Sequence, residues 1–362
     1  MSGEFLEAIE EICKDKGIDR ETLLEAIEAA LVSAYKKNYG SAPNVKVGID
    51  RQTGVVKVFA QKKVVDEVKD DLLEIDVAEA KKLRPGTQVG EVLDIEVTPK
   101  NFGRIAAQNA KQVVVQRIRE AERGLIYEKY VEMENEIVTG LVQRVEKRNV
   151  FIDLDKTEAF LPPSEQMPGE TYQVNNRIKV YITEVKKTTK GPQITVSRTH
   201  PGLVKRLFEL EVPEISRGEV LIKNISREAG SRTKIAVYAE DREIDPVGSC
   251  VGHKGTRVQK IVDELKGEKI DIIKWSEDPA EYISSALSPA KVLSVMPVLN
   301  EKSATVIVPD NQLSLAIGKE GQNARLAAKL TGWKIDIKSQ SQAQNVQDSQ
   351  NNALYNGGGD VF

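Results

Sequence analysis

The fold expected for this chain is decided by residues 245–275, which read DPVGSCVGHKGTRVQKIVDELKGEKIDIIKW. A short apolar helix is expected to end at Val251. Residues 252–255 then form a loop, and the apolar residues that follow recur at helical spacing on one face of a second helix. A strand is expected over residues 269–273. The stretch therefore predicts a helix, a glycine-bounded loop, a second helix and a strand.

The loop has the composition of a site that grips a phosphate backbone. Gly252 and Gly255 bound it, and a sugar-phosphate chain can press against the main chain only where no Cβ intervenes. The N-terminus of the next helix offers unpaired N–H donors. His253 and Lys254 are expected where phosphates pass, with Arg257 just beyond. Two glycines at this spacing also commonly do no more than end one helix and start another.

A second copy of the pattern makes the nucleic-acid interpretation stronger. Gly318 and Gly321 flank Lys319 and Glu320, and Arg325 lies in the helix that follows. Gly252 and Gly318 are 66 positions apart, about the length of one small α/β module, and both copies close on Lys-Ile-Asp-Ile. Helix, two strands, helix, loop, helix and strand is the order of a bacterial-type (type II) KH domain. The sequence thus predicts two such domains in tandem.

Composition bounds the class of protein. The chain has 362 residues, which predicts several domains, and a net charge of −3. Two separated cysteines, Cys13 and Cys250, support neither a disulfide framework nor a thiolate metal site and suggest a reducing cytosol. We find no signal peptide or apolar span, so a cytoplasmic location is expected. No catalytic constellation or phosphate-binding loop ending in Gly-Lys-Ser/Thr is present; we predict no enzyme, no cofactor and no metal.

The first domain is expected over residues 1–134. Two helices flank Gly17, two strands form a hairpin around residues 51–54, and a helix over residues 103–133 is expected to break or bend near Gly124. Residues 1–40 hold nine acidic against five basic side chains. This acidic surface suits a basic protein partner and repels RNA, although a plain solvated helix face explains it as well.

Residues 135–199 predict a small barrel of the OB type. Five short strands follow one another with glycine and proline turns between them. Candidate RNA contacts here are Arg148, Phe151, Lys186 and Arg198, as stacking or phosphate-binding groups. Phe151 and Phe160 could equally belong to the barrel core, since strand residues alternate between faces and the register is unknown.

The remaining boundaries complete a multidomain α+β architecture. The first KH domain is expected over residues 200–277 and the second over residues 278–338. Residues 339–362 are rich in Ser, Gln, Asn and Gly and are expected to form a disordered tail. The expected order is therefore an α+β domain with a connecting helix, a five-stranded barrel, two KH domains and a tail.

Several longer runs resemble one bacterial family. These runs are SREAGSRTKIAV at residues 226–237, DPVG at 245–248, LSLAIG at 313–318 and GRIAAQ at 103–108. They resemble NusA, a family of bacterial transcription elongation and termination factors, and the resemblance covers residues 1–338. It implies the same domain order, with an S-one-type barrel.

The resemblance implies a function and partners. The first domain would dock on RNA polymerase near the RNA exit channel, and the barrel and KH domains would take the single-stranded nascent transcript. The protein would be a monomer that promotes pausing and hairpin-dependent termination and joins antitermination complexes with other factors. Glu320 departs from the expected pattern by placing an acid inside the second loop, which predicts a weaker grip there. A ribosome-associated RNA-binding protein without a polymerase role is the alternative.

Overall fold

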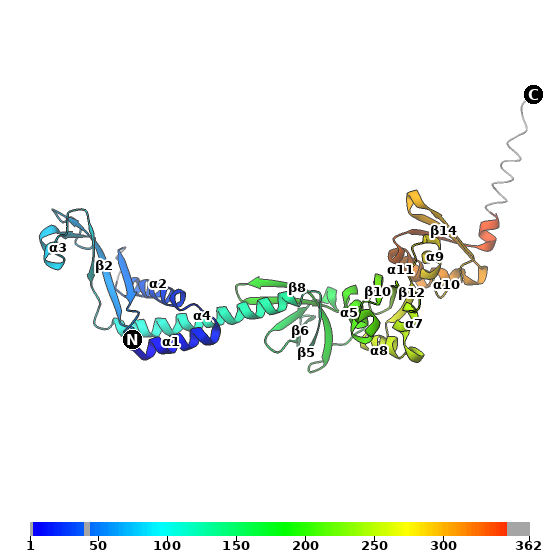
Figure 1. Ribbon diagram of the computed structural model, residues 1–362, viewed down its shortest axis with the longest axis horizontal. Helices are drawn as coiled ribbons and strands as arrows, with labels where there is room; N and C mark the ends of the chain where they lie inside the picture. The colour runs from blue at the N-terminus through cyan, green and yellow to red at the C-terminus, as the bar shows by residue number, and fades with distance from the viewer. Residues whose placement is uncertain (1–2, 40–43, 346–362) are drawn as a thin grey trace, which may run out of the picture. The chain divides into compact units, whose positions relative to one another are not determined.

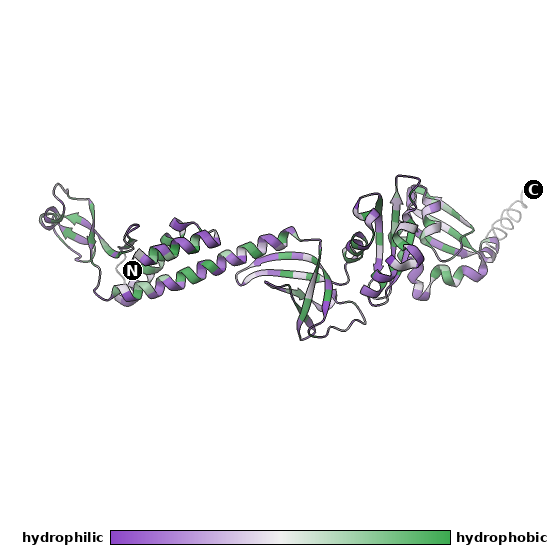
Figure 2. Cartoon of the chain, turned by 60° about the horizontal axis from the view of Figure 1, so that its bottom comes forward, coloured by the Kyte–Doolittle hydropathy of each residue, from purple (hydrophilic) through white to green (hydrophobic). Residues whose placement is uncertain are grey.

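The computed structural model describes residues 3–39 and 44–345 (Figure 1). The chain forms two compact units. The first takes in the residues up to Glu128 together with Thr189–Pro192, and the second takes in the other described residues from Lys129 onward. Figure 2 shows hydrophobic and hydrophilic residues alternating along the helices and strands, as expected for elements that bury one side.

The first unit is α+β, as predicted. Its elements are α1 (Gly3–Lys16), α2 (Arg20–Tyr39), β1 (Val45–Ile49), β2 (Val56–Val65), β3 (Glu74–Asp76), α3 (Val77–Leu83), β4 (Val92–Glu96) and α4 (Phe102–Glu132). Asp19 starts α2 by accepting a hydrogen bond from the Thr22 N–H at 2.8 Å. The helix α4 is continuous through Gly124, so of the two predicted alternatives the break is wrong and the bend stays a prediction; one glycine costs a helix only about 1 kcal/mol relative to alanine.

Two hydrophobic cores hold this unit. The larger one gathers side chains from α1, α2, β1, β2 and α4, among them Ile9, Leu24 and Phe102. The smaller one lies where β2 pairs with β3 and β4, around Val64 and Leu93. The long strand β2 therefore contributes to both cores.

The predicted five-stranded barrel is confirmed. Its strands are β5 (Ile137–Glu146), β6 (Asn149–Asp153), β7 (Glu158–Leu161), β8 (Arg177–Thr188) and β9 (Gly191–Ser197), with the short helix η1 (Pro163–Glu165). They close in the order β5-β6-β7-β9-β8. Gly140 is required inside β5, because a Cβ there would approach Ile152 Cγ2 to 2.3 Å.

Both KH domains have the predicted element order. The first contains α5 (Pro201–Glu211), α6 (Pro213–Ser216), β10 (Val220–Glu228), β11 (Arg232–Ala239), α7 (Pro246–Val251), η2 (His253–Gly255), α8 (Thr256–Glu264) and β12 (Lys269–Lys274). The second contains α9 (Pro279–Ala286), β13 (Ser294–Val298), η3 (Leu299–Glu301), β14 (Ser303–Val308), η4 (Asp310–Gln312), α10 (Leu313–Ile317), η5 (Lys319–Gly321), α11 (Gln322–Thr331) and β15 (Lys334–Ser339). In each sheet the central strand pairs antiparallel with the strand before it and parallel with the last strand.

The sheet of the first KH domain is covered on both faces. Along β11, Ile235 and Val237 pack into the core of the first KH domain, whereas Ala236 packs into the core of the second. Neighbouring strand residues point to opposite faces, so the second domain lies on the face that the first domain's helices leave open. Asn224 adds a hydrogen bond to the Leu330 carbonyl at 3.1 Å. The two KH domains thus share a packed boundary.

The prediction that disorder starts at residue 339 is wrong for the first seven of those residues. Ser339 belongs to β15, and residues 340–345 are helical. This turn is held because Ser341 donates to Asp310 Oδ2 at 2.9 Å and the Ser339 N–H donates to Gln342 Oε1 at 3.0 Å. The rest of the predicted tail, residues 346–362, lies outside the described residues.

Candidate nucleic-acid interface

The two GxxG loops have the same backbone. Gly252 has φ 73° and ψ 175°, and Gly318 has φ 77° and ψ 171°. The third loop residue is left-handed in both, with φ 51° at Lys254 and φ 52° at Glu320. The internal repeat deduced from the sequence is therefore a repeat of conformation as well.

The first glycine of each loop is required for a different reason from Gly255. A Cβ on Gly252 would lie 2.7 Å from Arg257 Cγ, and one on Gly318 would lie 2.8 Å from the Asn323 N atom. The first glycine therefore allows close packing inside the protein. Gly255 has no heavy atom within 4 Å of such a Cβ and has a left-handed φ of 78°. Its outer side is open, which leaves the backbone accessible to a ligand.

The side chains between the glycines reach solvent. His253 and Lys254 of the first loop are exposed, as are Lys319 and Glu320 of the second. The first loop thus presents two basic groups, and the second presents one base with one acid, as the sequence predicts. The exposure of all four agrees with surface loops that a phosphate chain could approach.

Arg257 and Asn323 occupy equivalent positions in the two KH domains, and each binds the helix that precedes its loop. The Arg257 guanidinium donates to the Ser249 carbonyl at 2.5 Å and to Glu214 Oε2 at 2.9 Å. The Asn323 amide donates to the Ala316 carbonyl at 3.0 Å. Both side chains thus satisfy the last carbonyls of the helix that precedes the loop. In the structure, Arg257 stabilises the C-terminal end of α7. Its contact with RNA stays a prediction.

The barrel resolves the alternative left open for its two phenylalanines. Val150 and Ile152 are buried, and Phe151 between them is only partly buried. Phe151 faces Phe160 across the strands, with ring centroids 5.7 Å apart, and the Arg144 guanidinium lies 3.8 Å from the Phe151 centroid. Neither ring is core. They form an aromatic patch on the outer face, and base stacking on it stays a prediction.

Arg148 and Lys186 also lie on the barrel surface. Arg148 has a left-handed φ of 70° in the turn between β5 and β6, where Gln166 donates to its carbonyl at 2.6 Å. Lys186 is exposed and pairs with Glu184 at 2.7 Å. Both remain available to a ligand, because a turn end and a surface ion pair leave the charged group in water.

Arg198 corrects the predicted site, because its side chain is 0% exposed. Its guanidinium donates to both oxygens of Glu170, to the Lys179 carbonyl, and to the carboxylate and carbonyl of Glu264. Burial opposes the charged form, but the hydrogen bonds and charge of Glu170 raise the pKa of Arg198 above its ordinary value. Arg198 joins the barrel to the first KH domain and cannot meet RNA at the surface.

Arg325 is at the surface but is already engaged. Its Nε donates to Glu228 Oε1 at 2.7 Å, and its Nη1 donates to the Glu320 carbonyl at 3.1 Å. Glu228 belongs to β10 of the first KH domain. The sequence could not reveal this partner, which lies 97 residues away along the chain.

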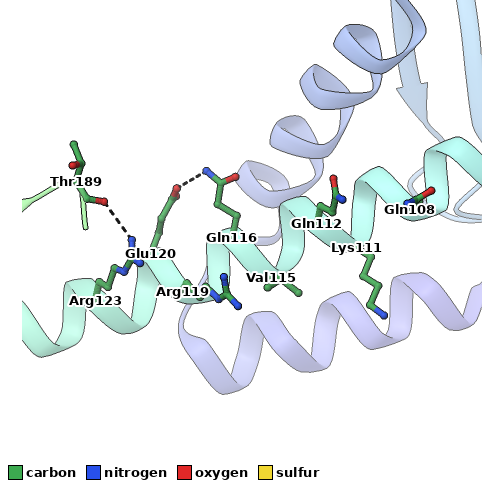
Figure 3. A pocket seen from close by; sticks show the side chains of 9 residues that line it. All are labelled: Gln108, Lys111, Gln112, Val115, Gln116, Arg119, Glu120, Arg123 and Thr189. Carbon is green, nitrogen blue, oxygen red and sulfur yellow. Dashed lines mark hydrogen bonds between the residues drawn. The ribbon is translucent and has the colours of Figure 1, made fainter. Parts of the chain in front are cut away.

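An open pocket lies along α4 in the first unit (Figure 3). It has a volume of about 770 Å³, and its lining is Gln108, Lys111, Gln112, Val115, Gln116, Arg119, Glu120, Arg123 and Thr189. Gln116 donates to Glu120 Oε1 at 2.9 Å. The lining holds no histidine or cysteine and no pair of carboxylates, so it does not resemble an acid–base or nucleophilic site.

Two further findings apply to the described residues. Within residues 3–39 and 44–345, no three His, Cys, Asp or Glu side chains gather where they could hold a metal ion. In the same ranges, no helix combines the length and apolar character needed to cross a membrane.

A barrel of the OB type followed by two KH domains with open GxxG loops defines a protein built from RNA-binding folds. The sequence matches four family models in the same order: the NusA N-terminal domain over residues 4–124, the S1 RNA binding domain over 132–197, the NusA-like first KH domain over 198–275 and the NusA-like second KH domain over 279–345.

Curated relatives agree over nearly the whole chain. The chain is 62% identical over 346 residues to the transcription termination/antitermination protein NusA of Halalkalibacterium halodurans, covering 96% of this chain and 91% of the relative. It is 62% identical to the protein of the same name from Bacillus subtilis, covering 96% and 93%. The Thermus thermophilus protein of that name is 44% identical, covering 93% and 90%. The chain belongs to the NusA family of transcription termination/antitermination factors.

Proposed function

We propose that residues 1–134 dock this chain on RNA polymerase near the RNA exit channel, while the barrel and KH domains contact the nascent transcript. In this position the protein lengthens pauses, promotes hairpin-dependent termination and takes part in antitermination complexes. The setting is the cytoplasm, where transcription and translation share one compartment in bacteria.

One observation carries the proposal: three RNA-binding folds are joined in one chain to an α+β unit that matches the N-terminal domain of a transcription factor family. The outer faces of α1 and α2 in that unit are acidic and exposed. The exposed acids are Glu4, Glu7, Glu10, Glu11, Asp15, Glu21 and Glu25. Such a surface repels RNA and favours a basic protein patch.

Attachment to polymerase gives weak RNA contacts an effect that they lack in solution. A tethered RNA-binding unit meets the emerging transcript at a high effective concentration. The alternative, a ribosome-associated RNA-binding protein, requires the same barrel and KH domains but gives the first unit no role at the polymerase. The names of the curated relatives favour the transcription role.

Two fragments test the proposal. Residues 1–134 should bind core polymerase without RNA, more weakly as salt is raised, because surface charges are screened. Residues 135–362 should bind RNA but lose most of the pause enhancement. Pause lifetimes on one template, measured with the full chain and each fragment, provide the readout. Equal pause enhancement by residues 135–362 would refute docking through the first unit and favour the ribosome-associated alternative.

A further inference from the structure

The second GxxG loop is tied to the first KH domain by an ion pair. Arg325 lies in the first turn of α11, directly after the loop, and its Nε donates to Glu228 Oε1 at 2.7 Å. The side chains are 47% and 25% exposed, respectively. The pair therefore bridges two domains at the edge of a predicted RNA contact and still faces solvent.

Glu228 uses both carboxylate oxygens in this contact. Its Oε2 accepts a hydrogen bond from Gln322 Nε2 at 2.8 Å, and the same nitrogen lies 2.8 Å from Ser231 Oγ. The hydrogen bond from Arg325, more than any other contact, lowers the pKa of Glu228 below its ordinary value. The carboxylate is consequently charged at neutral pH.

The first loop has no arginine at the position equivalent to Arg325, and its own neighbouring cation, Arg257, pairs with Glu214 at 2.9 Å. Gln259 occupies the position equivalent to Arg325, 66 residues earlier, and its amide donates to Asp263 at 2.8 Å. Within the part of the chain that the structure describes, no ion pair engages His253 or Lys254. The two loops thus share a backbone but differ at this position, where the second loop has an arginine that a carboxylate of the other KH domain engages and the first loop has a glutamine.

A carboxylate and a phosphate compete for the same groups of arginine. The guanidinium presents its N–H donors in a planar fork that fits either oxyanion. An RNA phosphate that approaches Arg325 meets Glu228 within a few ångströms, and like charges at that distance repel. The hydrogen bond and charge of Glu228 raise the pKa of Arg325 most, and the charge of Glu320, a second acid, raises it further.

We propose that Glu228 is an internal competitor for RNA at the second KH loop: it occupies Arg325 in the free protein and must give it up when a phosphate binds. The proposal rests on the RNA-binding part of the proposed function and not on the polymerase contact. When Arg325 binds a phosphate, it breaks its ion pair with Glu228, and the loss of that pair offsets part of the binding energy. The affinity of the second loop is therefore set by a residue of the first KH domain.

The test is Glu228→Gln in the full chain, because glutamine keeps the size of the side chain and an acceptor for Arg325 but removes the charge. The ligand is a fluorescein-labelled single-stranded RNA of mixed sequence, titrated at several salt concentrations. We expect binding about three- to tenfold tighter at low salt, since one repulsion is removed and one cation is released. The plot of log affinity against log salt should steepen by about 0.7, the value for one additional single-strand phosphate.

Two further variants make the result specific. In an Arg325→Gln background, Glu228→Gln should give little gain, because no cation is left to release. Glu301→Gln removes the same charge from the second KH domain outside this network, where Glu301 accepts a hydrogen bond from Ser303 at 3.3 Å. It should give a smaller gain than Glu228→Gln.

Three outcomes would overturn the proposal. They are unchanged or weaker RNA binding by Glu228→Gln, the same gain with Arg325→Gln present, and an equal gain from Glu301→Gln. Weaker binding would mean that Glu228 holds Arg325 in place for RNA instead of competing with it. None of these titrations contains polymerase, so their failure is separate from a failure of the pause assay.

Discussion

The buried guanidinium of Arg198 gives the sharpest stability prediction. Five hydrogen bonds surround it, to the two oxygens of Glu170, the Lys179 carbonyl, and the carboxylate and carbonyl of Glu264, at 2.6 to 3.1 Å. Every N–H of the group therefore has an acceptor. Arg198→Lys keeps the positive charge but offers at most three donors from one point.

The magnitude follows from the acceptors that lysine leaves unpaired. Two of the five acceptors lose their donor, and each costs about 1 to 3 kcal/mol where it is shielded from water. We expect the free energy of unfolding to fall by about 3 kcal/mol, which lowers the melting temperature of a unit of this size by roughly 6 to 12 °C. RNA affinity below the transition should match that of the parent, because Arg198 is buried.

The assay uses fluorescence, since the only two tryptophans, Trp275 and Trp333, lie in the KH domains. Urea unfolding followed by tryptophan emission therefore reports on the second unit. Arg217→Lys is the matched control, because Arg217 pairs with Glu219 at 2.8 Å on the surface and should tolerate the change. An Arg198→Lys protein that unfolds at the parent's midpoint but binds RNA about tenfold more weakly would refute the structural role and restore the predicted RNA contact.

Three further predictions concern the loops, the barrel and the thiols. Changing His253 and Lys254 together to Asp should cost a few kcal/mol of RNA affinity, by titration, whereas Lys319→Asp should cost less because its loop already holds an acid. Phe151→Ala should weaken RNA binding by about 1 to 3 kcal/mol, with little change in the urea midpoint, since the ring is on the barrel surface. Burial raises the pKa of Cys250 to about 12, so this thiol is protonated at pH 8 and should react with a thiol reagent only after unfolding; rapid labelling in the native state would contradict this.

Local sequence patterns predicted the helices, strands and loops. They could not predict contacts between residues that are far apart in the sequence. The two GxxG loops could be predicted because glycine at 252, 255, 318 and 321 permits the positive φ of 73° to 78° that other residues rarely adopt. The side chain of Phe151 could not be assigned to a face, because β5 shifts register between Val142 and Arg144 and the pairing depends on that irregularity. Sequence periodicity does not locate such a bulge.

The role of Arg198 was missed for a related reason. An arginine at the end of a barrel strand looks like a phosphate contact, and only its partners show otherwise. Glu170 and Glu264 lie 28 and 66 residues away in sequence, and Glu264 belongs to another domain. The sequence around Arg198 gave no clear sign of burial. Its neighbours Ser197 and Thr199 are polar, so the local sequence fits a surface arginine as well as a buried one.

The two loops indicate how a duplicated motif can keep its backbone conformation while its proposed affinity for RNA changes. Lys254 and Glu320 occupy the same left-handed position, at φ 51° and 52°, in loops whose flanking glycines permit this shape. The side chain there can change sign without altering the backbone N–H groups that a phosphate would meet. Under the proposed function a weak second loop still contributes, because an RNA strand bound at the first loop would meet the second at a high local concentration. With Glu228 competing for Arg325, the second contact should break more easily than the first, which suits a protein proposed to follow a growing transcript.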